Sequence, residues 1–496
     1  MILNAIMNLM NLKLLLLILM GTASGIVIGC LPGLTATMGV ALLLPLTFGM
    51  DAANGILLLI GIYIGAVYGG SISAILLRTP GTPASAATAI DGYALSSKGE
   101  SGRALGISTV SSFGGGMISA LALMFISPLL AKLALKFTAQ EYFALALFGL
   151  SIIASISGKS IIKGLISGTL GLIIAMIGVD PITGQMRYTF DSINLMNGIS
   201  FIPIMIGLFA LSQFFIALEN TYKNSNEAKI KTKKILKVFP EISDLKKIFP
   251  TIIRSGLIGT FIGIIPGAGA DIGAFISYNE AKRFSKNPEE FGKGAIEGIA
   301  APESGNNGVT GGALVPLLTL GIPGDAVAAI MLGALMMQGI QPGPLLFKEN
   351  GELAYTIFLG LLVANVVMLI LGLLGIRIFT QISKIPKKFL YPTIFILCIV
   401  GAYGINNSSF DIVVMIVSGI IGYFMEKFEF PSSPVVLALI LGPMAESNLR
   451  RSLVMSQGDY STFFTRPFSL FFIILAIFTL FLPIIKSLLK AKNNKN

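Results

Sequence analysis

A few polar side chains stand inside otherwise apolar sequence and could bind ions. The stretch AAPESGNNGVTGG, residues 300–312, holds Glu303, Asn306 and Asn307 between two apolar runs. Carboxylate and amide oxygens are hard ligands that suit a small cation such as sodium, and amide N–H groups can donate to a carboxylate. The alternative is a surface turn rich in Asn and Gly. The immediate return to apolar sequence argues against that alternative.

Two further carboxylates follow Pro-Gly pairs. Asp271 lies one turn beyond Pro266-Gly267, and Asp325 directly follows Pro323-Gly324. An ionisable side chain within sequence that is apolar enough to span a membrane predicts a cation or proton site. Helix capping is the alternative role for both residues. The predicted cation-coupling residues are therefore Asp271, Glu303, Asn306, Asn307 and Asp325.

Small hydroxyl side chains and one arginine flank other Pro-Gly pairs. Hydroxyls can donate hydrogen bonds to a substrate carboxylate without filling a cavity. The planar guanidinium of Arg78 can pair with a carboxylate through two parallel hydrogen bonds. The alternatives are that small residues only let helices pack closely, and that Arg78 snorkels to the interface or neutralises Asp91. The predicted substrate-binding residues are Pro32, Gly33, Thr35, Thr37, Arg78, Thr79, Gly81, Thr82, Gly267, Gly269, Asn306, Asn307 and Gly324.

A sequence repeat must position these residues. The segment 25–45 matches 259–277 at a constant offset, and 69–90 matches 312–330 around the Pro-Gly pairs. Proline removes a backbone donor and glycine permits a non-helical turn. Each unit, about 25–92 and about 259–335, therefore predicts two helices that are broken within the membrane.

Basic residues predict that the two units have opposite orientations. Lys98 and Arg103 follow the first unit directly, whereas the basic loop at Arg377 lies one further span beyond the second unit. Basic loops favour the cytoplasm, so the two units are expected to be inverted, which is typical of secondary transporters with a midplane site. The predicted organisation is a first half at 1–218, a basic cytoplasmic linker at 219–254 and a second half at 255–496.

Composition bounds the class of protein. The chain has 496 residues, of which 54% are hydrophobic and 12% charged, with a mean hydropathy of +0.84. These values predict an all-α polytopic membrane protein with about eleven or twelve transmembrane segments. Histidine is absent, which excludes histidine-based catalysis and proton relays, and no HExxH or Walker motif occurs. We therefore expect neither an enzyme nor a self-contained ATP-driven pump.

Several strings resemble the large permease subunit of the tripartite tricarboxylate transporters, the TctA family. They occur in the family's order and include GCLPGLTATMGVALLLPLTFGMD, GGSISAILLRTPGTPASAATAIDGYAL, GAIEGIAAPESGNN and GGALVPLLTLGIPGDAVAAIMLGALMMQGIQPGPLLF. The resemblance implies a multi-pass inner-membrane symporter that takes up tricarboxylates such as citrate, or dicarboxylates, by alternating access. It also implies a small TctB-like membrane subunit, a TctC-like periplasmic binding protein, and co-transported Na⁺ or H⁺ with no bound cofactor.

The chain departs from the family pattern at two places. The family's PEAANN-like string reads PESGNN at residues 302–307, which keeps the carboxylate and both amides, and Arg78 stands where many relatives are expected to have a neutral residue. Two other functions stay open at this point. One is a carboxylate or cation exchanger that needs no binding protein, and the other is an intramembrane enzyme using Asp271 and Glu303 as acid and base.

Overall fold

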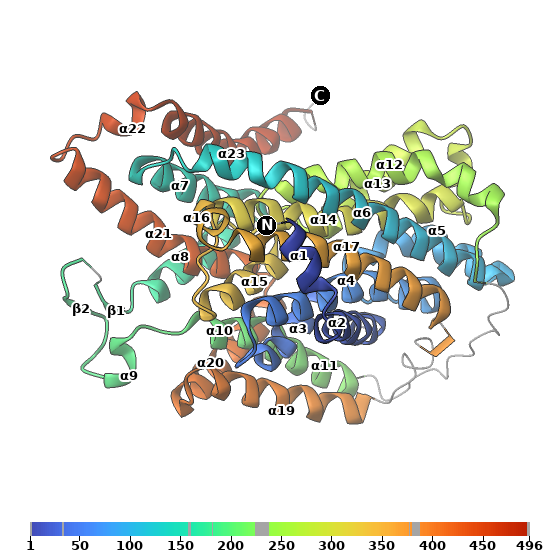
Figure 1. Ribbon diagram of the computed structural model, residues 1–496, viewed down its shortest axis with the longest axis horizontal. Helices are drawn as coiled ribbons and strands as arrows, with labels where there is room; N and C mark the ends of the chain where they lie inside the picture. The colour runs from blue at the N-terminus through green and yellow to red at the C-terminus, as the bar shows by residue number, and fades with distance from the viewer. Residues whose placement is uncertain are drawn as a thin grey trace. The chain divides into compact units, whose positions relative to one another are not determined.

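The computed structural model describes residues 2–31, 34–156, 160–180, 182–223, 238–375, 377–378 and 387–493 (Figure 1). Within these ranges the regular secondary structure is helical apart from one short antiparallel ribbon, β1 (Gly178–Val179) paired with β2 (Met186–Arg187). Six of the described helices are long and apolar enough to cross a membrane, and further apolar helices are shorter. The predicted all-α multi-pass membrane fold is confirmed.

The chain forms two compact units, residues 1–131 with 209–407, and residues 132–208 with 408–496. Each predicted sequence half contributes to both units, so the domain boundaries at 218 and 255 stay predictions. The first unit contains both repeats. The first repeat comprises α2 (Leu12–Cys30), α3 (Ala36–Leu43), α4 (Ala52–Leu77) and α5 (Ser85–Leu95). The second comprises α12 (Ile242–Ile264), α13 (Ala270–Phe284), α14 (Ile296–Leu320) and α15 (Ala326–Met337).

Every predicted break separates two helices. The breaks lie between α2 and α3, α4 and α5, α12 and α13, and α14 and α15. Pro32 and Gly33, in the first break, lie outside the described residues. The other elements of this unit are α1 (Ile2–Leu9), η1 (Leu44–Thr47), η2 (Ser96–Glu100), most of α6 (Ser101–Ala134), α11 (Ser212–Lys223), η4 (Pro288–Glu290), α16 (Pro344–Glu349), α17 (Gly351–Leu374) and α19 (Lys387–Asn406); η3 (Ile206–Leu211) belongs to both units.

Glycines bring α2 and α4 into backbone contact. A Cβ atom on Gly25 would lie 2.3 Å from the carbonyl oxygen of Ile62, and one on Gly65 would lie 2.2 Å from that of Thr22. The same close approach recurs at four-residue spacing along both helices, at Gly21, Gly29, Gly61 and Gly69. Small residues at this spacing let the backbones of two apolar helices approach closely. Such packing matters in a membrane because the hydrophobic effect does not drive helices together in lipid.

The second repeat uses the same device. A Cβ atom on Gly259 would lie 2.0 Å from the carbonyl oxygen of Gly305, and one on Gly312 would lie 2.4 Å from that of Thr260. These contacts join α12 to α14, as the glycines above join α2 to α4. The sequence repeat is therefore also a structural repeat.

Contacts between the repeats show their relative direction. Thr88 of α5 hydrogen-bonds Glu303 of α14, while Asp91, further along α5, accepts from the Ala295 N–H just before α14 begins. The equivalent pair behaves alike: Asp325, before α15, meets Tyr63 of α4, and Gln338, after α15, lies beside Gly55 near the start of α4. Each short helix thus runs antiparallel to the long helix of the other repeat. Within the first repeat, Gly81 lies beside Gly70, and Gly92 of α5 lies beside Ile75, so α5 runs in the same direction as α4. The long helices α4 and α14 are therefore antiparallel, which is the inverted relation predicted from the charges.

The second compact unit is a separate group of helices. It comprises α7 (Ala139–Ile156), α8 (Ile161–Ala175), α9 (Ile193–Met196), α10 (Phe201–Met205), α20 (Ser409–Lys427), α21 (Ser433–Met455), α22 (Thr462–Thr465) and α23 (Pro467–Asn493). Helix α7 packs against α8, α21 and α23. Phe463 and Ile473 pack around Ala144, and Leu437 packs near Ile153.

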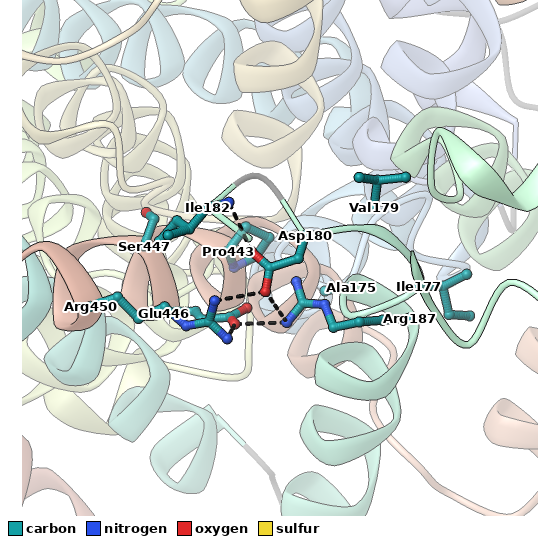
Figure 2. Close-up of a pocket in the computed structure, with 10 residues that line it drawn as sticks. All are labelled: Ala175, Ile177, Val179, Asp180, Ile182, Arg187, Pro443, Glu446, Ser447 and Arg450. Atoms are coloured by element: carbon teal, nitrogen blue, oxygen red, sulfur yellow. Dashed lines mark hydrogen bonds and ion pairs between the residues drawn. The ribbon is translucent and has the colours of Figure 1, made fainter. Parts of the chain in front are cut away.

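An ion-pair network fastens the ribbon of this unit to α21. Arg450 donates to Asp180 at 2.7 Å, and Arg187 and Arg450 each lie 2.7 Å from the same oxygen of Glu446 (Figure 2). The residues line a cavity of about 100 Å³, and the two positive charges balance the two negative ones. The Ile182 backbone N–H first, and the Arg450 guanidinium next, hold the pKa of Asp180 well below its usual range.

The glycine contacts predict a stability defect in Gly25→Ala. The added methyl group would overlap the Ile62 carbonyl, so helix separation should cost about 1–3 kcal/mol. Thermal unfolding of the detergent-solubilised protein should show a lower transition temperature. Gly404→Ala is the control, because its Cβ would sit 3.5 Å from the Phe48 ring. Equal melting of both variants with the wild type would mean that α2 and α4 are not closely packed.

The ion-pair network predicts a pH-dependent effect of Asp180→Asn. The depressed pKa means that the carboxylate stabilises the fold above its unfolded pKa of about 4, and that this contribution fades as pH falls towards the lower folded value. The variant should therefore unfold at a lower temperature than the wild type at pH 7, with the gap narrowing below about pH 4. A gap that is the same at every pH would contradict the charge-based explanation. Glu349→Gln, at an exposed site, serves as the control.

Candidate functional site

Glu303 lies fully buried in α14 within a group of hydroxyl side chains. Ser71 and Thr88, both from the first repeat, donate to Oε1. Ser108 and Ser112 of α6 donate to Oε2 at 3.1 and 2.7 Å. Among the described residues, no lysine or arginine pairs with this carboxylate. A buried charge is expensive unless it is hydrogen-bonded or paired, so the hydroxyl donors are what makes this carboxylate tolerable.

Asn306 and Asn307 are also fully buried in α14. The surface-turn interpretation of this stretch is therefore wrong: the segment is helical and enclosed on all sides. The Asn307 amide donates to the Glu303 carbonyl oxygen at 3.1 Å. The side-chain oxygen Oδ1 of Asn307, and both polar side-chain atoms of Asn306, have no protein partner among the described residues. Unpaired polar atoms inside a protein are costly, and they point to a ligand or water.

Asp325 caps α15 and joins the repeats. Its Oδ1 accepts from the Ala328 N–H at 2.7 Å, and its Oδ2 accepts from the Tyr63 hydroxyl at 2.5 Å. The structure therefore supports the capping role, which was the alternative to cation binding. Asp271, in contrast, is exposed in the first turn of α13.

The starts of two half-helices lie against one another. Ala84 and Ala87 of the α5 segment pack with Ala270 and Ala274 of α13, and α15 packs against α3 in the equivalent way. No side chain caps α13 at Gly269. A helix N-terminus attracts anions through its N–H groups and its dipole. At the start of α5, the N–H groups of Ser85 and Ala86 donate to the carbonyl oxygens of Thr82 and Pro83.

The predicted glycines hold the breaks together. The Gly81 N–H donates to the Gly70 carbonyl at 3.2 Å, and a Cβ there would lie 2.1 Å from the Gly29 carbonyl oxygen. In the second repeat, the Gly267 N–H donates to the Gly324 carbonyl at 2.6 Å. In the second repeat the two breaks thus meet, and in the first the α4–α5 break lies against α4 and the end of α2. A side chain at Gly81 would push the Gly29 carbonyl aside.

The predicted hydroxyl residues have mainly local partners. Thr35 caps α3 by accepting from the Met38 N–H, and Thr37 is half-buried in the same turn. Thr79 is exposed and donates to the Leu77 carbonyl. Buried Thr82 exchanges hydrogen bonds with Ser85. These contacts leave a direct role in substrate binding as a prediction.

Arg78 ends α4 in a left-handed conformation, with φ 56°. Its guanidinium lies 5.6 Å from the centre of the Tyr93 ring, and both residues line a cavity of about 540 Å³ beside the break. This volume is within the range of small-molecule sites. Arg78 is exposed, so its cation is accessible to an anion from solution.

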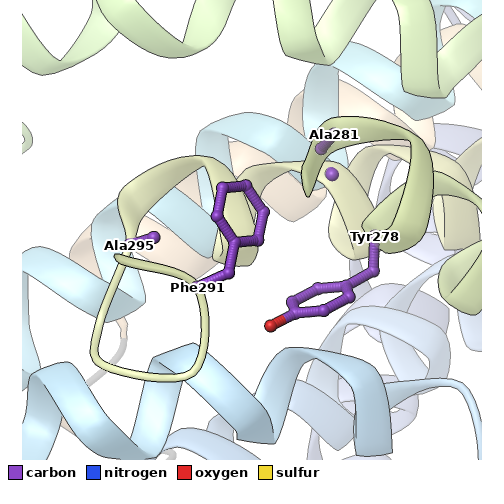
Figure 3. Close-up of a cluster of buried hydrophobic side chains, with 5 residues drawn as sticks. Tyr278, Ala281, Phe291 and Ala295 are labelled. Atoms are coloured by element: carbon purple, nitrogen blue, oxygen red, sulfur yellow. The ribbon is translucent and has the colours of Figure 1, made fainter. Parts of the chain in front are cut away.

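Asp91 does not pair with Arg78. Its Oδ1 accepts from the N–H groups of Gly292, Gly294 and Ala295, and its Oδ2 accepts from the Tyr278 hydroxyl. Figure 3 shows the Tyr278 ring of α13 facing Phe291, which lies on the loop leading to α14. The Asp91 carboxylate thus fastens the N-terminus of α14 to α5, and the alternative that Arg78 neutralises it is wrong.

Comparison with known proteins places this chain in a family. Residues 15–437 match the Tripartite tricarboxylate transporter TctA family. The chain belongs to the TctA family. It is 38% identical over 447 residues to an uncharacterized 52.8 kDa protein of the TAR-I ttuC' 3' region of Agrobacterium vitis, covering 90% of this chain and 88% of the relative.

A second relative matches over a shorter stretch. The uncharacterized protein of the TAR-II ttuC' 3' region of Agrobacterium vitis is 42% identical over 209 residues, which is 42% of this chain and 86% of the relative. No solved structure matches. This TctA-family chain is thus a multi-pass membrane protein of a transporter family, and its breaks and buried polar residues lie within the matched region.

Sequence reasoning missed several residues of this TctA-family site. The hydroxyl partners of Glu303 and the Tyr63 partner of Asp325 were not predicted. Ser108 and Ser112 stand four residues apart, on one face of a helix, in sequence rich in Gly and apolar residues. That spacing was the available signal. The sequence around Ser71 and Thr88 gave no such signal, because their relevance depends on how the first repeat packs against Glu303.

Substitutions at Asp325 separate capping from transport. Asp325→Ala should lower stability by about 1 kcal/mol through loss of the cap. Asp325→Asn keeps an oxygen for the Ala328 N–H, so it should melt close to the wild type. Melting curves and uptake by the purified variants would be measured together. If Asp325→Asn melts normally but takes up no substrate, the carboxylate acts in transport as well as in capping.

Proposed function

We propose that this chain is the large permease subunit of a secondary transporter that takes up organic carboxylates together with a cation. Family membership supports the transporter class. The main support for a carboxylate substrate is the inverted pair of broken helices. The N-terminal ends of α5 and α13 pack together through small alanines. Positive helix ends near the bilayer midplane suit the carboxylate groups of a substrate.

The cavity beside Arg78 supports a carboxylate over a neutral substrate. It offers a guanidinium, the Tyr93 ring and the surface of α5 in a space of about 540 Å³. A guanidinium can hold a carboxylate through two parallel hydrogen bonds. We propose tricarboxylates such as citrate first, and dicarboxylates second, as the substrates.

Buried oxygens support coupling to a cation. Glu303, Asn306 and Asn307 lie together on α14, and no basic side chain among the described residues neutralises Glu303. A co-transported Na⁺ or H⁺ would balance that charge during the cycle. We propose symport by alternating access, in which one repeat moves against the other around the fixed site.

The proposed setting is the bacterial-type inner membrane, with a TctB-like small subunit and a TctC-like periplasmic binding protein as partners. Family membership is the support for these partners. We also propose that the chain is not an enzyme. Asp271 is exposed at the start of α13 while Glu303 is enclosed by hydroxyls, and the two carboxylates share no hydrogen-bond partner among the described residues.

Reconstituted transport tests this function. Proteoliposomes holding the chain, with and without the small subunit and binding protein, would be given labelled citrate and other carboxylates under a sodium or a proton gradient. We expect gradient-driven uptake only when all three proteins are present. Arg78→Gln should reduce uptake about tenfold or more, as expected for loss of a charged contact worth about 1.5–3 kcal/mol, while Arg78→Lys retains part of it.

Two results would change the proposal. Uptake by this chain alone would make it a self-sufficient exchanger, and the partners would be withdrawn. Undiminished uptake by Arg78→Gln would remove the cavity beside Arg78 from the substrate path. Lys348→Gln, which removes an exposed charge elsewhere in the first unit, controls for a general effect of net charge.

A further inference from the structure

We infer that Glu303 and the hydroxyls of Ser71, Thr88, Ser108 and Ser112 form a binding site for a dehydrated monovalent cation, with sodium as the physiological ion. This inference rests on the proposed cation-coupled transport and names the atoms that carry the ion. Four of these five residues lie outside the polar stretch and the Pro-Gly breaks that the sequence singled out.

The site is closed and lined with oxygen atoms. The five side chains provide six oxygen atoms, two from the carboxylate and one from each hydroxyl, with Ser71 and Thr88 against Oε1 and Ser108 and Ser112 against Oε2. Each of the five residues is at most 1% exposed. No nitrogen or sulfur atom takes part in these contacts. Such a set favours a hard cation that is held by oxygen ligands.

The charge of the site fits one positive charge. One carboxylate with neutral hydroxyls neutralises a monovalent ion, whereas calcium sites normally contain several carboxylates. Among the described residues, no group of three or more acidic or cysteine side chains could hold a metal ion. A hydroxyl oxygen has two lone pairs and a rotatable hydrogen, so each can turn from donating to Glu303 to coordinating a cation.

Unpaired amides on the same helix supply a second, independent observation. Asn306 follows Glu303 by nearly one helical turn, and both of its polar side-chain atoms are buried without a partner among the described residues. The side-chain amide oxygen Oδ1 of Asn307 is likewise without a partner among the described residues. Buried amide oxygens without donors gain most from a nearby cation. Both amides lie within four residues of Glu303 on the same helix.

The position of the site explains how ion binding can act on transport. Ser71 and Thr88 belong to the first repeat, whereas Glu303 belongs to the second. An ion held by both repeats stabilises the arrangement in which they are close and leaves other arrangements less favoured. Movement of one repeat against the other would therefore change the affinity of the site for the ion.

Direct sodium binding tests the inference without any transport step. Purified full-length chain in detergent would be titrated with sodium-22, with choline replacing sodium in controls. We expect saturable binding by the wild type and about tenfold or greater loss of affinity in Ser112→Ala and Thr88→Val, in line with the effect of altered metal-site ligation. Glu303→Gln should abolish binding. Ser111→Ala is the matched control, because Ser111 is equally buried on α6 but does not bond Glu303.

The outcomes separate this inference from the proposed function. Wild-type sodium affinity in both Ser112→Ala and Thr88→Val would overturn the site, even if Glu303→Gln fails to fold. Absence of sodium binding, with citrate uptake driven by protons and lost in Glu303→Gln, would make Glu303 a proton carrier and overturn the sodium assignment while leaving carboxylate transport intact. Sodium binding that depends on these hydroxyls, with no carboxylate taken up by the three-protein system, would support the site and refute the proposed substrate class.

Discussion

Close contact between glycine-faced helices is the interaction on which the first compact unit depends. In each repeat a pair of helices meets at van der Waals distance between backbones, α2 with α4 and α12 with α14. Any side chain at Gly25, Gly65 or Gly259 would push a carbonyl oxygen aside. Lipid tails are as apolar as the side chains of the helices, so the hydrophobic effect does little to bring helices together in a membrane. Van der Waals packing between closely fitting helices is therefore a main source of stability. The backbone at each break can be irregular because closely packed helices flank it.

The same packing brings polar groups to the boundary between the repeats. Glu303 with Thr88, Asp325 with Tyr63 and Asp91 with the start of α14 are all contacts between the first repeat and the second. Polar contacts in an apolar interior are specific, because each donor or acceptor without its partner is costly. They therefore fix how the repeats pair. Because these polar contacts involve few residues, an ion or a substrate could replace them with contacts to itself.

Glu303 and Asp325, two carboxylates of the second repeat, differ in their surroundings. Asp325 caps α15 and accepts from Tyr63, whereas within the described part of the chain the Glu303 carboxylate accepts only from side-chain hydroxyls, which can turn away from it. A cap is fixed because it satisfies backbone N–H groups, while a hydroxyl loses little by rotating. Family membership assigns the chain to the TctA transporters, and this difference is the reason that we propose Glu303, and not Asp325, as the acid that exchanges partners during transport.

The sequence by itself determined the membrane class, the two repeats, their Pro-Gly breaks and their inversion, because these depend on composition, local backbone chemistry and the distribution of charge. It also identified Glu303, Asn306 and Asn307 as buried polar candidates, since polar residues within apolar runs are conspicuous. It could not say that Asp325 is a cap shared with Tyr63, that Asp91 fastens α14, or that Ser71, Thr88, Ser108 and Ser112 surround one carboxylate. These facts join residues far apart in the chain, and only the packing of the two inverted repeats decides which side chains meet.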